Sequence, residues 1–197
     1  MTDADKPANP IASGSELQLK GPHWTFILKL YGSREVQQAC LLLQDSFGID
    51  ISFLLTLVWY ATHGVGFDHG DIEALDHAIA SWRSDVVHPL RTMRREIKLA
   101  ASQDGVIGDY RNKIKSIEIE AEQIEIAMLM KTVEWRKLTG VSDKTIEPAP
   151  IARTVETVLA FYVARAELPA VQLQMPAMRA AINALVDTAA RANSELR

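Results

Sequence analysis

The chain has 197 residues, of which 48% are apolar, and a formal net charge of −4 at pH 7. These values are typical of a globular protein that buries its own core, as one domain or as one domain with a helical appendage. The acidic balance argues against general nucleic-acid binding, which needs a basic excess. The single cysteine, Cys40, excludes an intrachain disulfide and a cysteine-based metal cluster. Its apolar neighbours predict a buried, inert thiol.

Residues 1–20 do not have the basic and apolar pattern of a secretory signal. Their prolines and small polar residues predict a flexible tail. The longest apolar run, Ile51 to Ala61, is shorter than the roughly 18 residues that a membrane span requires. We therefore expect a cytoplasmic protein without a membrane span.

From Pro22 onward, almost every segment has helical spacing, so the sequence predicts an all-α fold, a helical bundle. A first helix is expected over 23–31, with Gly32 at its end. Ser33 is a suitable N-cap for a second helix over 33–47.

The third helix, expected to begin after Asp50, has apolar residues around most of its circumference, as a helix at the centre of a core does. Aromatic residues are concentrated in these first three helices. They are more often simple core, but Trp24, Phe53 and Trp59 could also line a pocket for an apolar ligand.

A fourth helix is expected from Asp71 to the region of Pro89, where it kinks or stops and restarts. After a turn near Asp104, a long helix over 107–138 is expected to fold back as an antiparallel hairpin. Its apolar residues step alternately by four and three. This spacing predicts the seam of the hairpin: Tyr110, Ile114, Ile117, Ala121, Ile124 and Met128.

The expected organisation is a main bundle over 21–140, a proline-bearing linker over 141–150 and a C-terminal helical pair over 151–197. The last helix has an apolar face that needs a partner. That partner is either the main bundle or a second chain.

Three segments stand out together: WTFILKLYGSREVQQACLLLQDSFGIDISFLL, WRSDVVHPLRTMRREIK and IEIEAEQIE. In this combination the chain resembles the bacterial family of unknown function DUF2390, over about Trp24 to Met130. The resemblance implies a small all-helical cytosolic protein with no established reaction. None of the segments is a catalytic motif, so the resemblance supplies no active site.

The most suggestive constellation is a basic segment before the turn and an acidic one after it. Arg91 lies 13 positions before Asp104 and Glu118 lies 14 after it, which at about 1.5 Å per residue puts them level in a hairpin. One interpretation is a salt-bridge ladder flanking an apolar seam, with each exposed pair contributing about 0–1 kcal/mol. The acidic members would be Glu118, Glu122 and Glu125.

Counting positions from Asp104 in the same way puts Arg94 level with Ile114 and Lys115. Arg94 is therefore expected to have no carboxylate opposite it. A small basic patch would then be available to an acidic partner or an anionic group. Its candidate residues are Trp82, Arg83, Arg91, Arg94, Arg95, Lys98 and Lys115. Trp82 with Arg83 is also a common kind of interface anchor.

Catalytic and metal chemistry have weaker signals. His69, Glu73 and His77 are four apart and could offer metal ligands, but a solvated polar face explains them more simply. Glu118 and Glu122 could act as an acid/base pair only if burial raised the pKa of one of them. We therefore expect no cofactor, and the sequence favours a non-enzymatic role.

The leading hypothesis is a helical interaction or adaptor module that docks a protein partner on the basic patch. Homodimer formation through the long helix or the terminal helices is a further option. The alternative is a carrier or sensor that holds a small apolar or acyl-type ligand in the aromatic-lined pocket.

Overall fold

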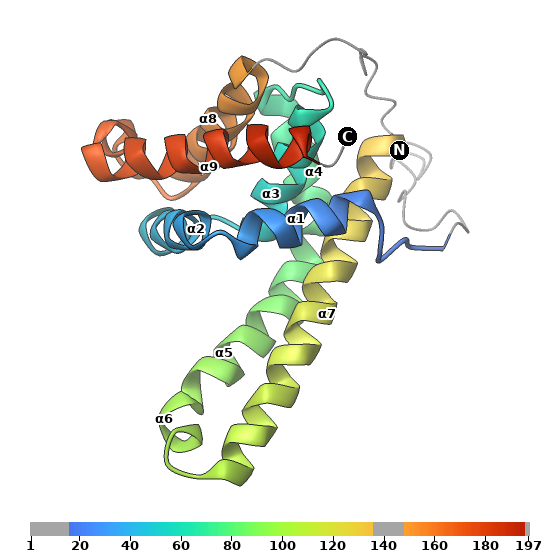
Figure 1. Cartoon of the computed structure of the whole chain (residues 1–197), viewed down its shortest axis with the longest axis vertical. Coiled ribbons are helices and arrows are strands. Elements are labelled where there is room, and N and C mark those ends of the chain that lie inside the picture. Colours follow the sequence, from blue (N-terminus) through green and yellow to red (C-terminus); the bar gives the residue numbers. More distant parts are fainter. Residues whose placement is uncertain (1–15, 136–147, 196–197) are drawn as a thin grey trace, which may run out of the picture. The chain divides into compact units, whose positions relative to one another are not determined.

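The computed structural model describes residues 16–135 and 148–195, which contain helices and no strand (Figure 1). The predicted all-α fold is confirmed. Most of the predicted tail, residues 141–147 of the predicted linker and the expected end of the long helix lie outside the described residues, whereas 148–150 belong to the helix Pro148–Arg165. None of the described helices has the length and the apolar content needed to cross a membrane.

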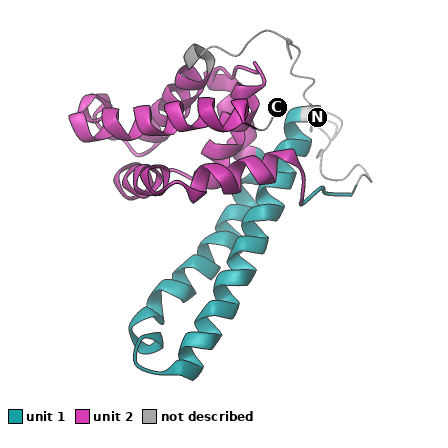
Figure 2. Cartoon of the chain, viewed as in Figure 1, with its two compact units in different colours: residues 1–19, 78–137 teal, residues 20–77, 138–197 magenta. Residues whose placement is uncertain are grey.

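The chain divides into two compact units, coloured separately in Figure 2. Among the described residues, unit 1 contains 16–19 and 78–135, and unit 2 contains 20–77 and 148–195. The sequence-based division into a bundle and a C-terminal pair does not coincide with these units. The last two helices instead belong to the same unit as the first three.

Unit 2 is built around α3, against which α1, α8 and α9 pack, while α9 also lies along α2. The helices that contribute to this unit are α1 (Pro22–Gly32), α2 (Arg34–Phe47), α3 (Ile51–Thr62), the first part of α4 (His69–Trp82), α8 (Pro148–Arg165), the 3₁₀ helix η3 (Ala170–Gln174) and α9 (Pro176–Ser194).

Local sequence explains how α2 ends and α3 begins. Gly48 ends α2 in the left-handed region, at φ 66°, and its N–H donates to the carbonyl of Gln44 at 2.8 Å. The Asp50 carboxylate then accepts from the Phe53 amide at 3.1 Å and caps α3. Most residues of α3 are buried, as predicted for the central helix. Ser33 precedes α2 at the predicted position, but its side chain makes no capping bond.

The thiol of Cys40 is fully buried on α2, as predicted. Burial disfavours the charged thiolate and raises the pKa of Cys40 to about 12. The thiol is therefore unreactive at physiological pH.

Two sets of contacts join the C-terminal helices to the rest of unit 2. The buried Asp76 carboxylate of α4 accepts from the Tyr162 hydroxyl at 3.2 Å and from Arg165 Nη1 at 2.7 Å, both on α8. Asn193 of α9 donates to the carbonyl of Thr62 at 3.3 Å. These bonds connect residues that are far apart in the sequence.

Unit 1 is a helical hairpin in which α5 and α6 lie beside α7. Its elements after α4 are the π-helix η2 (Arg83–Val87), α5 (His88–Glu96), α6 (Lys98–Ala101) and α7 (Gly105–Trp135). Asp104 caps α7 by accepting from the amides of Val106 and Ile107 at 2.8 and 3.2 Å. The predicted fold-back near Asp104 is confirmed.

The break predicted at Pro89 begins earlier, where α4 gives way to the π-helix at Arg83. Two residues of this stretch bond to α7, Arg83 and Arg91, and the buried Val87 lies midway between them at a spacing of four. A π turn holds more residues than an α turn, so successive steps of four remain on one face. The π-helix therefore keeps both arginines directed at α7.

The predicted seam of α7 is wrong in part. Tyr110 and Ile117 are 57% and 51% exposed. The residues buried on α7 at alternating steps of four and three are Ile114, Glu118, Ala121, Glu125, Met128 and Thr132. Two stripes of the helix have this spacing, and the buried one includes two glutamates that receive arginines from the opposite helices.

Candidate functional site

At the start of the hairpin, the predicted anchor residues are directed inward. Arg83 Nε lies 3.2 Å from Glu125 Oε1, and the two side chains are only 7% and 1% exposed. The indole Nε1 of Trp82 donates to the Ala121 carbonyl at 2.9 Å. Trp82 and Arg83 therefore hold the hairpin together and do not form an exposed anchor.

Further along the hairpin, two arginines of α5 share the Glu118 carboxylate. Arg91 donates through Nε to Glu118 Oε1 at 3.2 Å and through Nη2 to Glu122 Oε1 at 2.5 Å. Arg94 donates through Nε to Glu118 Oε2 and through Nη2 to Glu118 Oε1, the latter at 3.0 Å. The predicted meeting of Arg91 and Glu118 is confirmed. The prediction that Arg94 has no carboxylate is wrong.

The direction of helical side chains explains the error for Arg94. Side chains on a helix tilt toward its N-terminus. Because α5 and α7 are antiparallel, that tilt carries the Arg94 guanidinium toward later residues of α7, from the level of Ile114 to Glu118. Counting positions from the turn gives the level of the backbone only.

The paired groups of this ladder are held in their charged forms. Burial alone would raise the pKa of Glu118, but hydrogen bonds from Arg94 and Arg91 outweigh it, and the pKa lies below its usual value. The hydrogen bond to Glu118 raises the pKa of Arg94. Glu118 is therefore ionised at neutral pH, which argues against its acting as a general acid.

Three of the predicted cations remain exposed: Arg95, Lys98 and Lys115. None of them forms an ion pair with another side chain in the described part of the chain. Arg95 follows Arg91 by one turn of α5, and Lys115 precedes Glu122 by two turns of α7. Both therefore lie on the side of the hairpin marked by the Arg91–Glu122 pair.

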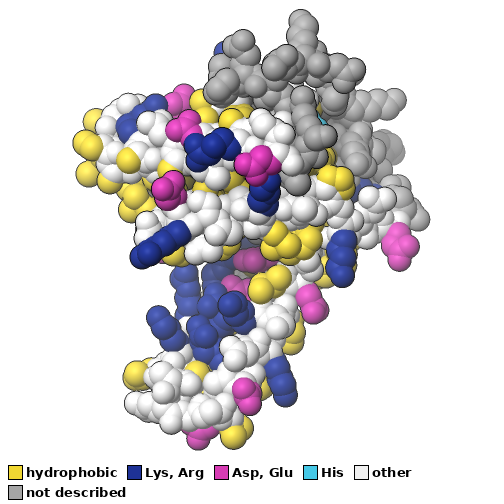
Figure 3. Space-filling view, viewed as in Figure 1, with side chains coloured by type: hydrophobic (Ala, Val, Ile, Leu, Met, Phe, Trp, Pro, Cys, Tyr) yellow, Lys and Arg dark blue, Asp and Glu magenta, His cyan; other side chains and the backbone are white. Residues whose placement is uncertain are grey.

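We call this side, with Arg91, Arg94, Arg95, Lys98 and Lys115, the basic face. Figure 3 shows Lys and Arg side chains gathered over the hairpin. Residues 91–115 contain seven Lys or Arg against three Asp or Glu, although the whole chain is acidic. Two members of this basic segment were not predicted, Arg111 and Lys113. Arg111 of α7 donates through Nε to the carbonyl of Arg94 at 3.2 Å.

The three aromatic residues of the predicted ligand pocket have different surroundings. Phe53 is fully buried, with its ring centre 6.3 Å from that of Tyr162. Trp59 is half-buried and its ring centre lies 4.4 Å from that of His63. Trp24 is also half-buried. A shallow pocket of about 260 Å³ lies between α2 and α9 and is lined by other residues. The carrier function therefore stays a prediction.

The predicted metal candidates His69, Glu73 and His77 all lie on α4, of which His69 is the first residue. The ring of His69 packs edge-on against Phe161 at 5.8 Å between ring centres. Within residues 16–135 and 148–195, no three His, Cys, Asp or Glu side chains are grouped closely enough to hold a metal ion.

Comparisons with known proteins identify one relationship. The family model described as protein of unknown function (DUF2390) matches residues 22–129, more than half of the chain. The comparison with curated proteins finds no match, and neither does the comparison with solved structures.

Proposed function

The chain belongs to the DUF2390 family, and we propose that it is a non-enzymatic interaction module that docks an acidic segment of a protein partner on its basic face. The proposal rests on one observation. After Arg91 and Arg94 are neutralised inside the hairpin, Arg95, Lys98 and Lys115 remain exposed.

The form of the basic face favours an extended acidic partner over a single small anion. A buried phosphate or carboxylate site needs several donors that converge in a desolvated cradle. Arg95 and Lys115 are instead exposed and lie on neighbouring helices, whose axes are typically 8–10 Å apart. A segment with several carboxylates can contact these cations at once.

The internal ion pairs prepare this surface for binding. Glu118 and Glu122 fix the guanidinium groups of Arg91 and Arg94, so the helix that carries Arg95 is held in place before a partner arrives. A preorganised surface loses less conformational entropy on binding than a flexible one.

We also place this action in the bacterial cytoplasm. The only cysteine is buried and its thiol stays protonated. A chain that needs no disulfide is suited to a reducing compartment.

The test is a double charge reversal on the basic face, Arg95→Glu with Lys115→Glu. Tagged wild-type and variant proteins would capture partners from a bacterial lysate, with identification by mass spectrometry. We expect acid-rich partners to be lost from the variant while its helical circular dichroism is unchanged. The matched control is Arg153→Glu, an exposed cation of α8 in unit 2, which should retain them.

Salt provides a second readout. Exposed charges are screened over about 8 Å at physiological ionic strength, so capture should weaken as salt is raised. An identical set of captured proteins in the wild type and the double variant would refute the proposal.

A further inference from the structure

A second surface of the hairpin lies on the outer side of α7. Val106, Tyr110 and Ile117 are 79%, 57% and 51% exposed. With the half-buried Ile124 they follow the spacing of a single helical stripe. This stripe is distinct from the buried one that receives Arg91 and Arg94. Large apolar side chains aligned on an exposed helix are typical of an interaction site.

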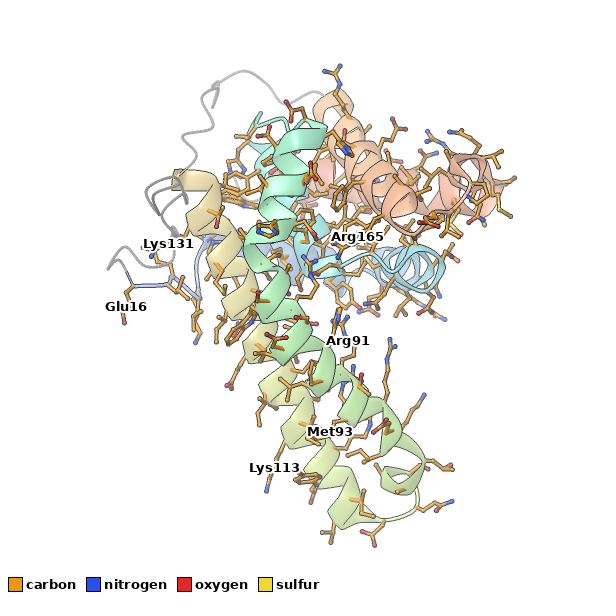
Figure 4. All side chains as sticks on the ribbon, turned by 180° about the vertical axis from the view of Figure 1, so that it is seen from behind. Glu16, Arg91, Met93, Lys113, Lys131 and Arg165 are labelled. Atoms are coloured by element: carbon orange, nitrogen blue, oxygen red, sulfur yellow. The ribbon has the colours of Figure 1, made fainter. Side chains whose placement is uncertain are left out.

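Two opposite charges complete this stripe. Lys113 lies between Tyr110 and Ile117, and Glu120 lies between Ile117 and Ile124, so the full stripe steps by four and three. Both charged residues are exposed, and neither forms an ion pair within the described chain. In Figure 4, Lys113 projects from the edge of α7 that faces away from α5.

The positions of these charges make the stripe self-complementary. At about 1.5 Å per residue, Lys113 lies roughly 6 Å before Ile117 along the helix axis and Glu120 roughly 4.5 Å after it. Tyr110 and Ile124 lie at equal distances on either side. A two-fold axis near Ile117 therefore brings unlike charges together and apolar residues together.

We propose that two copies of this chain associate through α7, in antiparallel orientation, about a two-fold axis near Ile117. Lys113 of each copy then lies beside Glu120 of the partner subunit, and Tyr110 packs near Ile124 of the partner subunit. A parallel pair would instead oppose two lysines and two glutamates. Such a same-surface contact is the usual form of a symmetric dimer.

This interface is independent of the proposed docking function. Lys115 of the basic face is two residues from both Lys113 and Ile117, so it lies on a different side of α7. Each surface can therefore be disrupted without altering the other.

The first test is a charge swap followed by light scattering coupled to gel filtration over a range of concentrations. The wild type is expected to form a dimer. Lys113→Glu or Glu120→Lys alone creates two like-charge contacts per dimer and should raise the dissociation constant about tenfold or more. The combination of both substitutions should restore the wild-type value. Lys115→Glu, the matched control, should leave the dimer intact.

Helical circular dichroism of each variant separates loss of association from loss of folding. A wild type that is monomeric at all concentrations would overturn the proposal. So would a dimer that is insensitive to both single reversals, or one that the double reversal fails to restore.

The orientation has its own test by oxidative cross-linking. A mixture of Tyr110→Cys and Ile124→Cys proteins should form a disulfide between the two species, since these positions meet in the antiparallel pair. Tyr110→Cys protein alone should not cross-link to itself. Self-linking of Tyr110→Cys without the mixed product would show a parallel pair and refute the proposed orientation.

Discussion

Glu118 joins both of its arginine partners on α5 to α7. It is 4% exposed and accepts hydrogen bonds from both Arg91 and Arg94. The predicted ladder of exposed pairs at the edge of the seam is in fact part of the buried seam. Removing one partner of such a pair strands the other charge, so the effect is larger than that of a surface pair.

The pKa of Glu118 predicts a stability that depends on pH. Its pKa in the folded protein is lower than the ordinary value of 4.5, so folding favours the ionised form. The stabilisation is complete above about pH 4.5 and is lost as the pH falls through the lower folded pKa. We expect Glu118→Gln to cost about 2 kcal/mol of unfolding free energy at pH 7.

Urea unfolding at several pH values would check this prediction. The difference between wild type and Glu118→Gln should shrink below about pH 4.5, because Glu118 of the unfolded wild-type chain then takes up a proton while the folded carboxylate stays ionised down to its lower pKa. Glu96→Gln, which removes an exposed carboxylate of α5, should have little effect. A cost that stays constant from pH 7 to pH 3 would contradict the assignment.

The Arg83–Glu125 pair predicts a difference between single and double substitution. Both side chains are almost fully buried, so Arg83→Met should cost about 3–5 kcal/mol by leaving the Glu125 charge without this partner. Changing both, Arg83→Met with Glu125→Leu, should recover most of the loss, since an apolar pair of similar volume needs no desolvation of charge. Chemical denaturation measures the unfolding free energy of the single and the double variant. An equal loss of unfolding free energy in the two variants would mean that Glu125 is stabilised in another way.

At the scale of elements, the π-helix explains how α4 and α5 both remain in register with α7. Arg83, the first residue of the π-helix, contacts Glu125, and Arg91, after the π-helix, contacts Glu118. A regular α-helix would turn residues spaced by four progressively off one face. The π-helix accommodates one extra residue, so that the side chains before and after it stay on the same face of the helix.

Deleting Ser84 should therefore convert the π-helix to a regular α-helix and preserve the pairs on both sides. Ser84 is exposed, and we expect a change in unfolding free energy within about 1 kcal/mol. Deleting the exposed Thr92 is the matched control, because it rotates Arg94 away from Glu118 and should cost about 2 kcal/mol or more. Hydrogen exchange in α5 would distinguish the two. A severe loss from the Ser84 deletion would contradict this account.

At the scale of the whole molecule, unit 2 is assembled from the two ends of the described chain. The hairpin segment 78–135 separates α1–α3 from α8 and α9 in the sequence. Because α3 is apolar nearly all round, it needs α8 and α9 as well as α1 to complete its burial. The family match ends at residue 129 and does not include these helices.

A chain of residues 1–137 should therefore lack a stable unit 2. We expect fast hydrogen exchange in α3 and a weak near-ultraviolet circular dichroism signal from its aromatic residues. Co-expression of residues 138–197 as a separate chain should restore both. Slow exchange in α3 of the truncated chain would show that α8 and α9 are not needed.

The sequence alone determined features that depend on local spacing. These include the helices, the start of α3 after Asp50, the buried Cys40 and the meeting of Arg91 with Glu118, since covalent geometry sets the level of residues on either side of a short turn. The tertiary structure decided what depends on side-chain direction and on distant partners. Packing against the arginines selected which stripe of α7 is buried. The tilt of the Arg94 side chain brought it to Glu118. Long-range contacts placed α8 and α9 with α1–α3. Two stripes of one helix can have the same apolar spacing, and only the neighbour that covers one of them distinguishes the core from the surface.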